Sequence, residues 1–380
     1  MRNLYLWIGI VMLFAGCRPN TSSGTYLVSD TQEVSSRVNL SEVLSDYRFI
    51  PLETSPESLI GGMVMKVAKK SNRFYISFNV SKLLIFNNDG KFIRSVSAIG
   101  GGPGEYLQLL DFDVNDSLIA LLDYKKIHFF SLEGVYENSV SIPCTGMNIK
   151  LLSDGNIAVR TSNESYSIYI VNREGKEISK HLETTHSSKL GRFNPFICHG
   201  DKIFLQEGAY SNRHWWYENG KTGQIDLLDH PDVLTLEQEE ILVQQGGFDY
   251  TGNAGKGALK LRTPISSGKK FLFSAWQNDK AYLYMGDFSS GKTRQYLLSP
   301  SETLVDDITY GKQGYALVRT NVSASENSFI SLLQPYVLAE ALDEHADQAG
   351  TPTYDAARQL LDSLGDVDNA NPILFEFNFK

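Results

Sequence analysis

Residues 74–96, FYISFNVSKLLIFNNDGKFIRSV, carry the pattern on which the fold of this chain depends. The apolar runs are those of strands buried between stacked sheets. Asp89-Gly90 separates the last two runs, and glycine supplies the positive φ that a tight hairpin turn requires. The segment therefore predicts a strand, an apolar strand, a glycine turn and a further strand that begins with a charged residue.

The same order of features returns along the chain. It recurs at residues 118–140, 157–182, 203–228 and 271–298, and the hairpin glycines are Gly90, Gly134, Gly175, Gly220 and Gly291. The gaps between successive glycines are 44, 41, 45 and 71 residues; the first three match the period of four-stranded propeller blades, and the last contains an insertion. One blade cannot cover both of its own faces, whereas blades packed around a ring can. The repeat therefore predicts a β-propeller.

The ends of the repeat predict how the ring closes. A sixth unit fits residues 304–320, with two strands around Gly311 to Gly314. The segments 47–52 (YRFIPL) and 372–379 (PILFEFNF) are expected as strands, one of which completes a blade begun at the opposite end of the chain. We therefore predict an all-β fold, a six-bladed β-propeller over residues 47–380.

A few helical insertions are expected besides the strands. Residues 329–347 and 354–364 have Ala, Leu, Glu and Asp at helical spacing and are predicted to decorate the last blade. A short helix is predicted at residues 235–245, where Thr235 and Gln238 are spaced as a capping box.

The N-terminus predicts export. Arg2 precedes a short apolar stretch, residues 4–15, which is typical of a signal peptide and short for a bilayer-spanning helix. Residues 14–17 (FAGC) resemble the lipobox of bacterial lipoproteins, with Phe in place of the usual Leu, so residues 1–16 are expected to be removed and Cys17 acylated. The alternatives are a plain secretory peptide and an uncleaved anchor helix. Residues 17–46 are expected to be a tether and N-terminal segment. No acidic residue directly follows Cys17, which favours the periplasmic face over the cell surface.

Composition limits the possible partners. A formal net charge of −9 over 380 residues, with no long Lys/Arg run, argues against nucleic acid. No HExxH, CxxC or Cys/His cluster is present, so we expect no metal and no cofactor. Cys144 and Cys198 could form a disulfide in an exported chain, but buried free thiols are favoured.

Three short segments carry a resemblance to a known family. They are FIPLET at residues 49–54, GGGPGEY at residues 100–106 and NPILFEFNFK at residues 371–380. On these segments the chain resembles the six-bladed β-propeller lipoproteins abundant in Bacteroides and relatives. The resemblance covers nearly the whole chain from Tyr47 onwards and implies the fold, export and a Gram-negative source. It implies no established activity.

Candidate site residues lie in two glycine-rich loops and beside them. GGGPGE lacks the Lys-Ser/Thr and the helix that a phosphate loop needs, so a tight inter-blade crossing is favoured there. The second loop, residues 246–257, suggests a mobile surface loop or lid. The ligand-binding candidates are Glu105, Tyr106, Asp249, Tyr250, Lys256 and Arg262. Asp249 and Arg262, like Asp111, Asp113 and Asp123, are candidates by residue type alone.

The sequence favours a binding function over catalysis. We expect a membrane-anchored binding or interaction module for a glycan, a peptide or an envelope partner. The alternative is a carbohydrate-active lyase or hydrolase with its site at the central channel, and a structural subunit of an envelope complex is a third reading. No catalytic motif is present. An exposed aromatic platform would indicate a glycan binder. Converging titratable groups would indicate an enzyme, and an exposed apolar patch would indicate a site for a partner protein.

Overall fold

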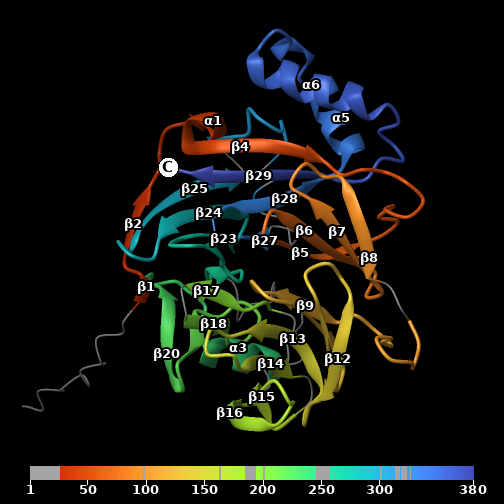
Figure 1. Cartoon of the computed structure of the whole chain (residues 1–380). Helices are drawn as coiled ribbons and strands as arrows, with labels where there is room; N and C mark the ends of the chain where they lie inside the picture. The colour runs from red at the N-terminus through yellow and green to blue at the C-terminus, as the bar shows by residue number, and fades with distance from the viewer. Residues whose placement is uncertain are drawn as a thin grey trace, which may run out of the picture.

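Six sheets form the blades of a β-propeller, and the apolar runs of the repeat form the middle strands of five of them (Figure 1). The computed structural model describes residues 26–96, 99–161, 164–184, 194–199, 202–244, 257–299, 302–312, 317, 323–325 and 327–380. Four antiparallel strands build each of the first three blades. Blade 1 holds β5 (Val64–Lys70), β6 (Arg73–Phe78), β7 (Lys82–Asn87) and β8 (Phe92–Val96). Blade 2 holds β9 (Asp111–Val114), β10 (Ile119–Asp123), β11 (Lys126–Phe130) and β12 (Tyr136–Ser141). Blade 3 holds β13 (Gly146–Leu151), β14 (Ile157–Thr161), β15 (Tyr166–Val171) and β16 (Glu177–Glu183).

The N-terminal residues add outer strands to the next two blades. Blade 4 holds β17 (Ile197–His199), β18 (Lys202–Gln206), β19 (Arg213–Glu218), β20 (Lys221–Leu228) and, parallel to β20, β1 (Tyr26–Val28). Blade 5 holds β21 (Lys260–Leu261), β22 (Ile265–Ser267), β23 (Lys270–Gln277), β24 (Lys280–Asp287), β25 (Lys292–Ser299) and, parallel to β25, β2 (Asp30–Glu33). Residues 26–46, expected as part of the tether segment, therefore contribute to the propeller itself.

Both ends of the chain meet in blade 6, which confirms the predicted closure. Its strands are β27 (Ser323–Ala324), β28 (Phe329–Leu333), β29 (Ile373–Phe379) and β4 (Leu44–Pro51), in that order. Phe375 of β29 pairs with Phe49 of β4, and their rings lie 5.3 Å apart. The outermost strand thus comes from the N-terminus and the next one from the C-terminus.

The prediction of a sixth unit at residues 304–320 is wrong. Only β26 (Leu304–Val305) is a strand among the described part of that stretch, and it pairs with β3 (Val38–Asn39) outside the blades. Asp306 ends it, because its carboxylate accepts hydrogen bonds from the backbone N–H groups of Ile308 and Thr309 and so closes a turn. The inner strands of blade 6 come from residues 323–333 instead.

The helix predicted at residues 329–347 is wrong at its start. Phe329–Leu333 is strand β28, whose five residues are all buried, and the helix α5 (Pro335–Glu344) begins with a proline at its first turn. Together with the 3₁₀ turn η4 (Ala346–Gln348) and α6 (Pro352–Leu364), α5 forms an insertion between β28 and β29. These helices rise above blade 6 in Figure 1.

Two other predictions of local structure are confirmed. The helix α3 (Leu236–Gln244) has the expected capping box, in which the Gln238 N–H donates to Thr235 Oγ1 at 3.1 Å and the Thr235 N–H donates to Gln238 Oε1 at 2.9 Å. The hairpin glycine Gly90 has φ 80°, and a Cβ there would lie 2.2 Å from the carbonyl oxygen of Pro51. A fourth described helix, α1 (Leu40–Val43), leads into β4.

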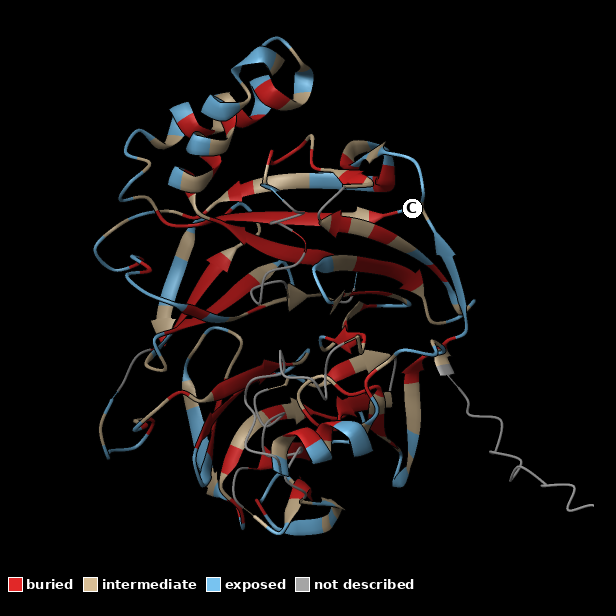
Figure 2. Cartoon of the chain, turned by 180° about the vertical axis from the view of Figure 1, so that it is seen from behind, coloured by how far each residue is buried: buried red, intermediate tan, exposed pale blue. Residues whose placement is uncertain are grey.

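The core lies between the blades. Tyr75, Ile85 and Phe112 belong to one buried apolar cluster between blades 1 and 2, and each of the other blade pairs contributes similar clusters. Figure 2 shows middle strands of the blades, such as β6 and β7, as mostly buried and outer strands, such as β8, as partly exposed. Trp215 is buried in such a cluster, as expected of a core residue. Cys144 and Cys198 are both free thiols.

Candidate functional site

The antiparallel blades give the propeller two different faces. In a four-stranded antiparallel blade, the first and third turns lie at one end and the second turn lies at the other, with the crossing to the next blade. We call the end with the first and third turns, such as residues 71–72 and 88–91, the hairpin face. The other end, with second turns such as residues 79–81 and crossings such as 99–110, is the crossing face.

Glu105 stabilises the crossing between blades 1 and 2. Its carboxylate accepts a hydrogen bond from the backbone N–H of Gly102 at 2.7 Å. A Cβ on Gly100 would lie 2.1 Å from Glu105 Oε2, so the carboxylate could not keep this position beside a larger residue. The carboxylate therefore folds back onto its own loop and fixes the backbone of the GGGPGEY segment.

Tyr106 is a core residue of the same crossing. Its side chain is 1% exposed and packs between blades 1 and 2. Its hydroxyl lies 2.8 Å from the carbonyl oxygen of Ser81 and 3.0 Å from that of Val96. A ligand on the surface does not reach this side chain.

Arg262 lies on the crossing face between blades 4 and 5. Its side chain is exposed and its guanidinium lies 5.7 Å from the ring centre of Trp276. The ring of Tyr210 meets Trp276 edge-on at 4.8 Å. The candidates Asp249, Tyr250 and Lys256 lie outside the described residues, as does Cys17.

The carboxylates Asp111 and Asp113 connect inner strands of neighbouring blades. Asp111 accepts hydrogen bonds from Lys66 Nζ of blade 1 at 3.0 Å and from the N–H of Ile149 of blade 3 at 2.9 Å. Asp113 pairs with Lys150 Nζ at 2.8 Å. Burial would lower the pKa of Lys150, but the Asp113 carboxylate raises it overall, so the ammonium stays charged.

Asp123 has a comparable structural role in blade 2. Its carboxylate accepts hydrogen bonds from the backbone N–H groups of Leu107 at 2.8 Å and Gln108 at 3.3 Å. The three carboxylates named by type in the sequence therefore hold blades and crossings in place. This accounts for their burial at the channel and the crossing face.

A group of exposed apolar side chains gathers on the crossing face over blades 1 and 2. We call it the apolar sector, and its members are Leu59, Met63, Met65, Ile99, Leu107 and Tyr124. Met63 is 66% exposed and Leu107 is 65% exposed, far more than is usual for large apolar residues. The sector includes half of the twelve exposed large apolar residues in the described part of the chain.

Hydrogen bonds connect the loops that carry the apolar sector. The N–H of Asn79 donates to the carbonyl oxygen of Met63 at 3.0 Å. The N–H of Leu109 donates to the carbonyl oxygen of Val80 at 2.7 Å. The Tyr124 hydroxyl donates to Gln108 Oε1 at 2.6 Å. These bonds place four loops side by side. They are the crossing into blade 1, the second turn of blade 1, the crossing into blade 2 and the second turn of blade 2.

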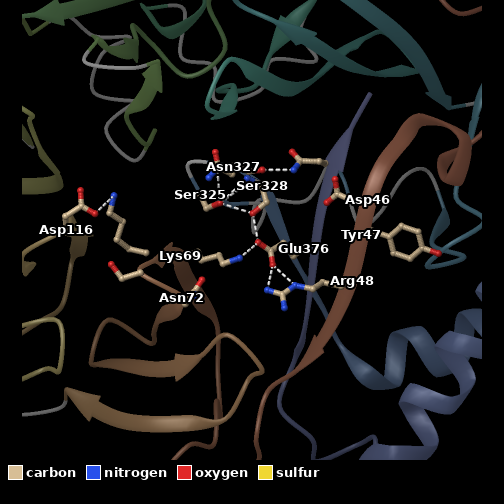
Figure 3. A pocket seen from close by; sticks show the side chains of 13 residues that line it. Asp46, Tyr47, Arg48, Lys69, Asn72, Asp116, Ser325, Asn327, Ser328 and Glu376 are labelled. Carbon is tan, nitrogen blue, oxygen red and sulfur yellow. Dashed lines mark hydrogen bonds and ion pairs between the residues drawn. The ribbon is translucent and has the colours of Figure 1, made fainter.

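A polar pocket of about 570 Å³ opens on the hairpin face between blades 6 and 1 (Figure 3). Its lining comes from separated segments of the chain: Asp46, Tyr47, Arg48, Lys69, Lys70, Ser71, Asn72, Asp116, Ser325, Asn327, Ser328, Glu376 and Asn378. Figure 3 shows the Tyr47 ring on the other side of β4 from Glu376, so the pocket has no aromatic platform. We call this cavity the polar pocket.

Glu376 forms the centre of the polar pocket. It accepts hydrogen bonds from Arg48 Nη2 at 2.6 Å and Arg48 Nε at 2.8 Å, from Lys69 Nζ at 2.5 Å and from Ser328 Oγ at 2.5 Å. Burial would raise the pKa of Glu376, but the hydrogen bonds from Lys69, Ser328 and Arg48 lower it overall. The carboxylate is therefore ionised at neutral pH and joins blade 1 to the closing strands β4 and β29.

Sequence reasoning missed both the apolar sector and the polar pocket. The sector had a weak local signal, since Met63 follows Gly61-Gly62 and Leu107 follows the GGGPGEY crossing, so large apolar residues occur where a surface loop is expected. The polar pocket had none, because ordinary polar residues separated by up to 332 positions (from Asp46 to Asn378) meet only when the ring closes.

No group of three or more His, Cys, Asp or Glu side chains in the described part of the chain is arranged to hold a metal ion. None of the described helices is both long and apolar enough to cross a bilayer.

Comparison with solved structures identifies one of similar fold over nearly the whole chain and others that match less well. The chain is similar to the crystal structure of a Bacteroides fragilis protein inferred to be exported, with a TM-score of 0.71, 16% identity, and coverage of 92% of this chain and 99% of that one. It also matches a Bacteroides caccae protein of unknown function, with a TM-score of 0.40, 11% identity, and coverage of 62% and 82%. The WD40 domain of Pan2 from Neurospora crassa matches with a TM-score of 0.42, 10% identity, and coverage of 72% and 74%.

Comparison with protein families shows to which family the chain belongs. No curated protein matches it. One family model matches residues 26–377. The match begins at the first residue of β1 and ends within β29, so it spans all six blades. The chain therefore belongs to the family described as a domain of unknown function, DUF4934.

Proposed function

We propose that this protein is an exported, lipid-anchored binding module that holds a polypeptide partner of the cell envelope on its crossing face. The observation that carries the proposal is the apolar sector. Large apolar side chains exposed together on one surface mark interaction sites, because leaving them in water forgoes the free energy of burial. The lipid anchor is assigned to Cys17, and export is supported by the apolar stretch before it.

The composition of the sector favours a protein over a sugar. Met63 and Met65 are flexible and polarisable, and such side chains adapt to varied apolar partners. Ile99 and Leu107 present no hydrogen-bonding group to a ligand hydroxyl. The fitting partner is a peptide segment or protein surface with exposed aliphatic or aromatic residues.

The loops of the sector are held in place before binding. Asp123 fixes the backbone at Leu107 and Gln108, and Glu105 fixes the glycine crossing just before them. A preorganised surface loses less conformational entropy when it binds. The buried Tyr106 hydroxyl anchors the same crossing to blade 1.

The alternative of a carbohydrate-active enzyme has less support. An enzyme would need titratable groups that converge on a substrate at the channel. The inner-strand carboxylates Asp111 and Asp113 are instead engaged with lysines and backbone N–H groups of neighbouring blades. These contacts favour binding over catalysis.

The proposal can be tested by site-specific photo-crosslinking in intact cells. A photoreactive phenylalanine analogue is placed at Leu107, and at Ile178 as a control. Ile178 is 56% exposed on the outer strand β16, so the two positions match in exposure and differ in face. We expect a defined adduct with one envelope protein from position 107 only, which the second change Met63→Glu abolishes.

Three outcomes would contradict the proposal. One is that position 107 gives no adduct, and another is that positions 107 and 178 give the same set of adducts. The third is an adduct at twice the mass of the chain, which would identify a second copy as the occupant.

A further inference from the structure

The charges at the floor of the polar pocket are not balanced. Arg48 and Lys69 share the single carboxylate of Glu376, and no other ion pair is found for either cation among the described residues. The side chain of Lys69 is 19% exposed and that of Glu376 is 8% exposed, whereas that of Arg48 is 40% exposed. Two cations and one carboxylate thus leave an excess positive charge in a partly desolvated site, where it attracts an anion more strongly than at the surface.

The rim of the pocket has the opposite character. Lys70 pairs with Asp116 at 2.9 Å, and Asp46 accepts a hydrogen bond from the Ser45 hydroxyl at 3.0 Å. The pocket as a whole therefore holds three cations and three carboxylates, with the positive excess at the floor and carboxylate acceptors at the rim. An anionic group fits the floor, and uncharged donors such as hydroxyls fit the rim.

The remaining wall consists of amide and hydroxyl side chains. The turn before β28 supplies Ser325 and Asn327, β29 supplies Asn378, and the turn between β5 and β6 supplies Asn72. Asn378 Nδ2 donates to the backbone oxygen of Asn327 at 2.6 Å, which holds this part of the wall in place (Figure 3). No aliphatic residue lines the cavity, so a polar ligand fits it.

We propose that the polar pocket binds a sugar acid, with its carboxylate at Arg48 and Lys69 and its hydroxyls at the amide and carboxylate groups of the rim. The cavity of about 570 Å³ lies within the range of small-molecule sites, about 300–1,000 Å³. This site is on the face opposite the apolar sector and does not depend on the partner proposed there. The ligand is either a free sugar acid or a uronate unit of a polysaccharide.

Titration calorimetry with the purified full chain tests the site. The probes are D-glucuronate, a digalacturonate, D-glucose and sodium acetate. We expect both uronates to bind, and glucose and acetate to bind at least about tenfold more weakly. Glucose lacks the carboxylate that forms charge-assisted hydrogen bonds, and acetate lacks the hydroxyl groups. Tighter binding of the digalacturonate identifies a polymer unit as the source, and tighter binding of glucuronate a free sugar acid.

Lys69→Met is the decisive variant, and Lys82→Met is its matched control. Both ammonium groups lie over a phenylalanine ring, Lys69 at 5.4 Å from Phe74 and Lys82 at 6.0 Å from Phe78. Lys82 follows a turn of the crossing face, away from the pocket. We expect Lys69→Met to weaken uronate binding about tenfold and Lys82→Met to leave it unchanged.

Asn327→Ala keeps the test valid if Lys69→Met does not fold. The Asn327 side chain lines the pocket, whereas its structural contact uses the backbone oxygen, which the substitution retains. It is expected to weaken uronate binding several-fold without changing thermal stability. The proposal is overturned if no uronate binds, if acetate or glucose binds as tightly, or if a folded pocket variant binds uronate like the unchanged protein.

Discussion

The side-chain amide of Asn371 connects to Glu53, with Nδ2 donating to the Glu53 carbonyl oxygen at 2.7 Å. Asn371 is 1% exposed, and its Oδ1 accepts a hydrogen bond from the N–H of Ile60 at 2.7 Å. Its backbone N–H donates to Thr54 Oγ1 at 2.8 Å. Two of the family-like segments, FIPLET and NPILFEFNFK, are therefore in contact, which gives a physical reason for their occurrence in one chain.

Replacement of Asn371 by Ala is expected to lower the free energy of unfolding by about 3 kcal/mol, because the carbonyl oxygens of Glu53 and Ser58 and the N–H of Ile60 lose their side-chain partner. Urea denaturation followed by fluorescence measures the change. Asn369→Ala is the control, since Asn369 is exposed and binds only the local turn through Asp366. Equal effects of the two substitutions would mean that the contact with Glu53 does not stabilise the closure.

The hairpin glycines are predicted to differ in their tolerance of a side chain. Gly90 and Gly220 have similar φ values, 80° and 76°, but a Cβ at Gly90 would lie 2.2 Å from the Pro51 oxygen and one at Gly220 would meet nothing within 4 Å. Gly220→Ala is expected to cost about 1 kcal/mol for the left-handed backbone alone. Gly90→Ala is expected to cost at least about 2 kcal/mol more, because the closing strand must shift. Chemical denaturation of each variant measures the loss of stability. Equal denaturation midpoints for the two variants would contradict the predicted difference between Gly90 and Gly220.

Glu376 predicts a pH dependence of stability. Its pKa is lowered below the usual 4.5 in the folded state, so the unfolded state binds more protons in this range. The stabilisation is therefore present above about pH 4.5 and is lost as the pH falls through the folded pKa.

Glu376→Gln is expected to remove this component of the pH dependence and to lower stability at pH 7 by about 3 kcal/mol, because Arg48 and Lys69 lose their counter-charge. Thermal unfolding between pH 3 and pH 7 is the measurement. Glu57→Gln, at an exposed position in the turn after β4, is the control. A variant that keeps the full pH dependence would rule out Glu376 as its source.

Cys17→Ala tests the anchor. Cells expressing the unchanged chain and the variant are extracted with a detergent that separates into two phases. We expect the unchanged chain in the detergent phase and the variant in the aqueous phase, because acyl chains contribute about 0.8 kcal/mol per buried methylene. Both chains in the aqueous phase would indicate a plain secretory peptide, and both in the detergent phase would indicate an uncleaved anchor helix.

The repeat was sufficient to predict the blades because its signals are local. Asp89-Gly90 and its equivalents fix the turns, and the apolar runs fix the strands buried between blades. Blade 6 was harder, because its third strand lies beyond a helical insertion and its fourth lies at the other end of the chain. Phe329–Leu333 was misassigned for a related reason, since a short apolar run next to a helix has no period of its own that marks it as a strand.

The candidate sites were less predictable from sequence than the fold. Glu105 and Tyr106 were named as ligand-binding candidates, and in the structure both are engaged within the crossing between blades 1 and 2. Lys69 and Glu376 are unremarkable strand residues until the ring brings them within 2.5 Å of each other. A site of this kind depends on long-range pairing, and no local spacing encodes it.

The pairing of Phe49 with Phe375 also bears on how the protein is made. A ribosome releases β4 long before β29. The outermost strand of blade 6 therefore has no β29 to pair with until almost the whole chain has emerged. Such distant pairings slow folding and leave strand edges open to other chains. The molecule is therefore expected to need chaperone protection until its last ten residues are free, and a truncation within them should leave blade 6 open rather than merely shorter.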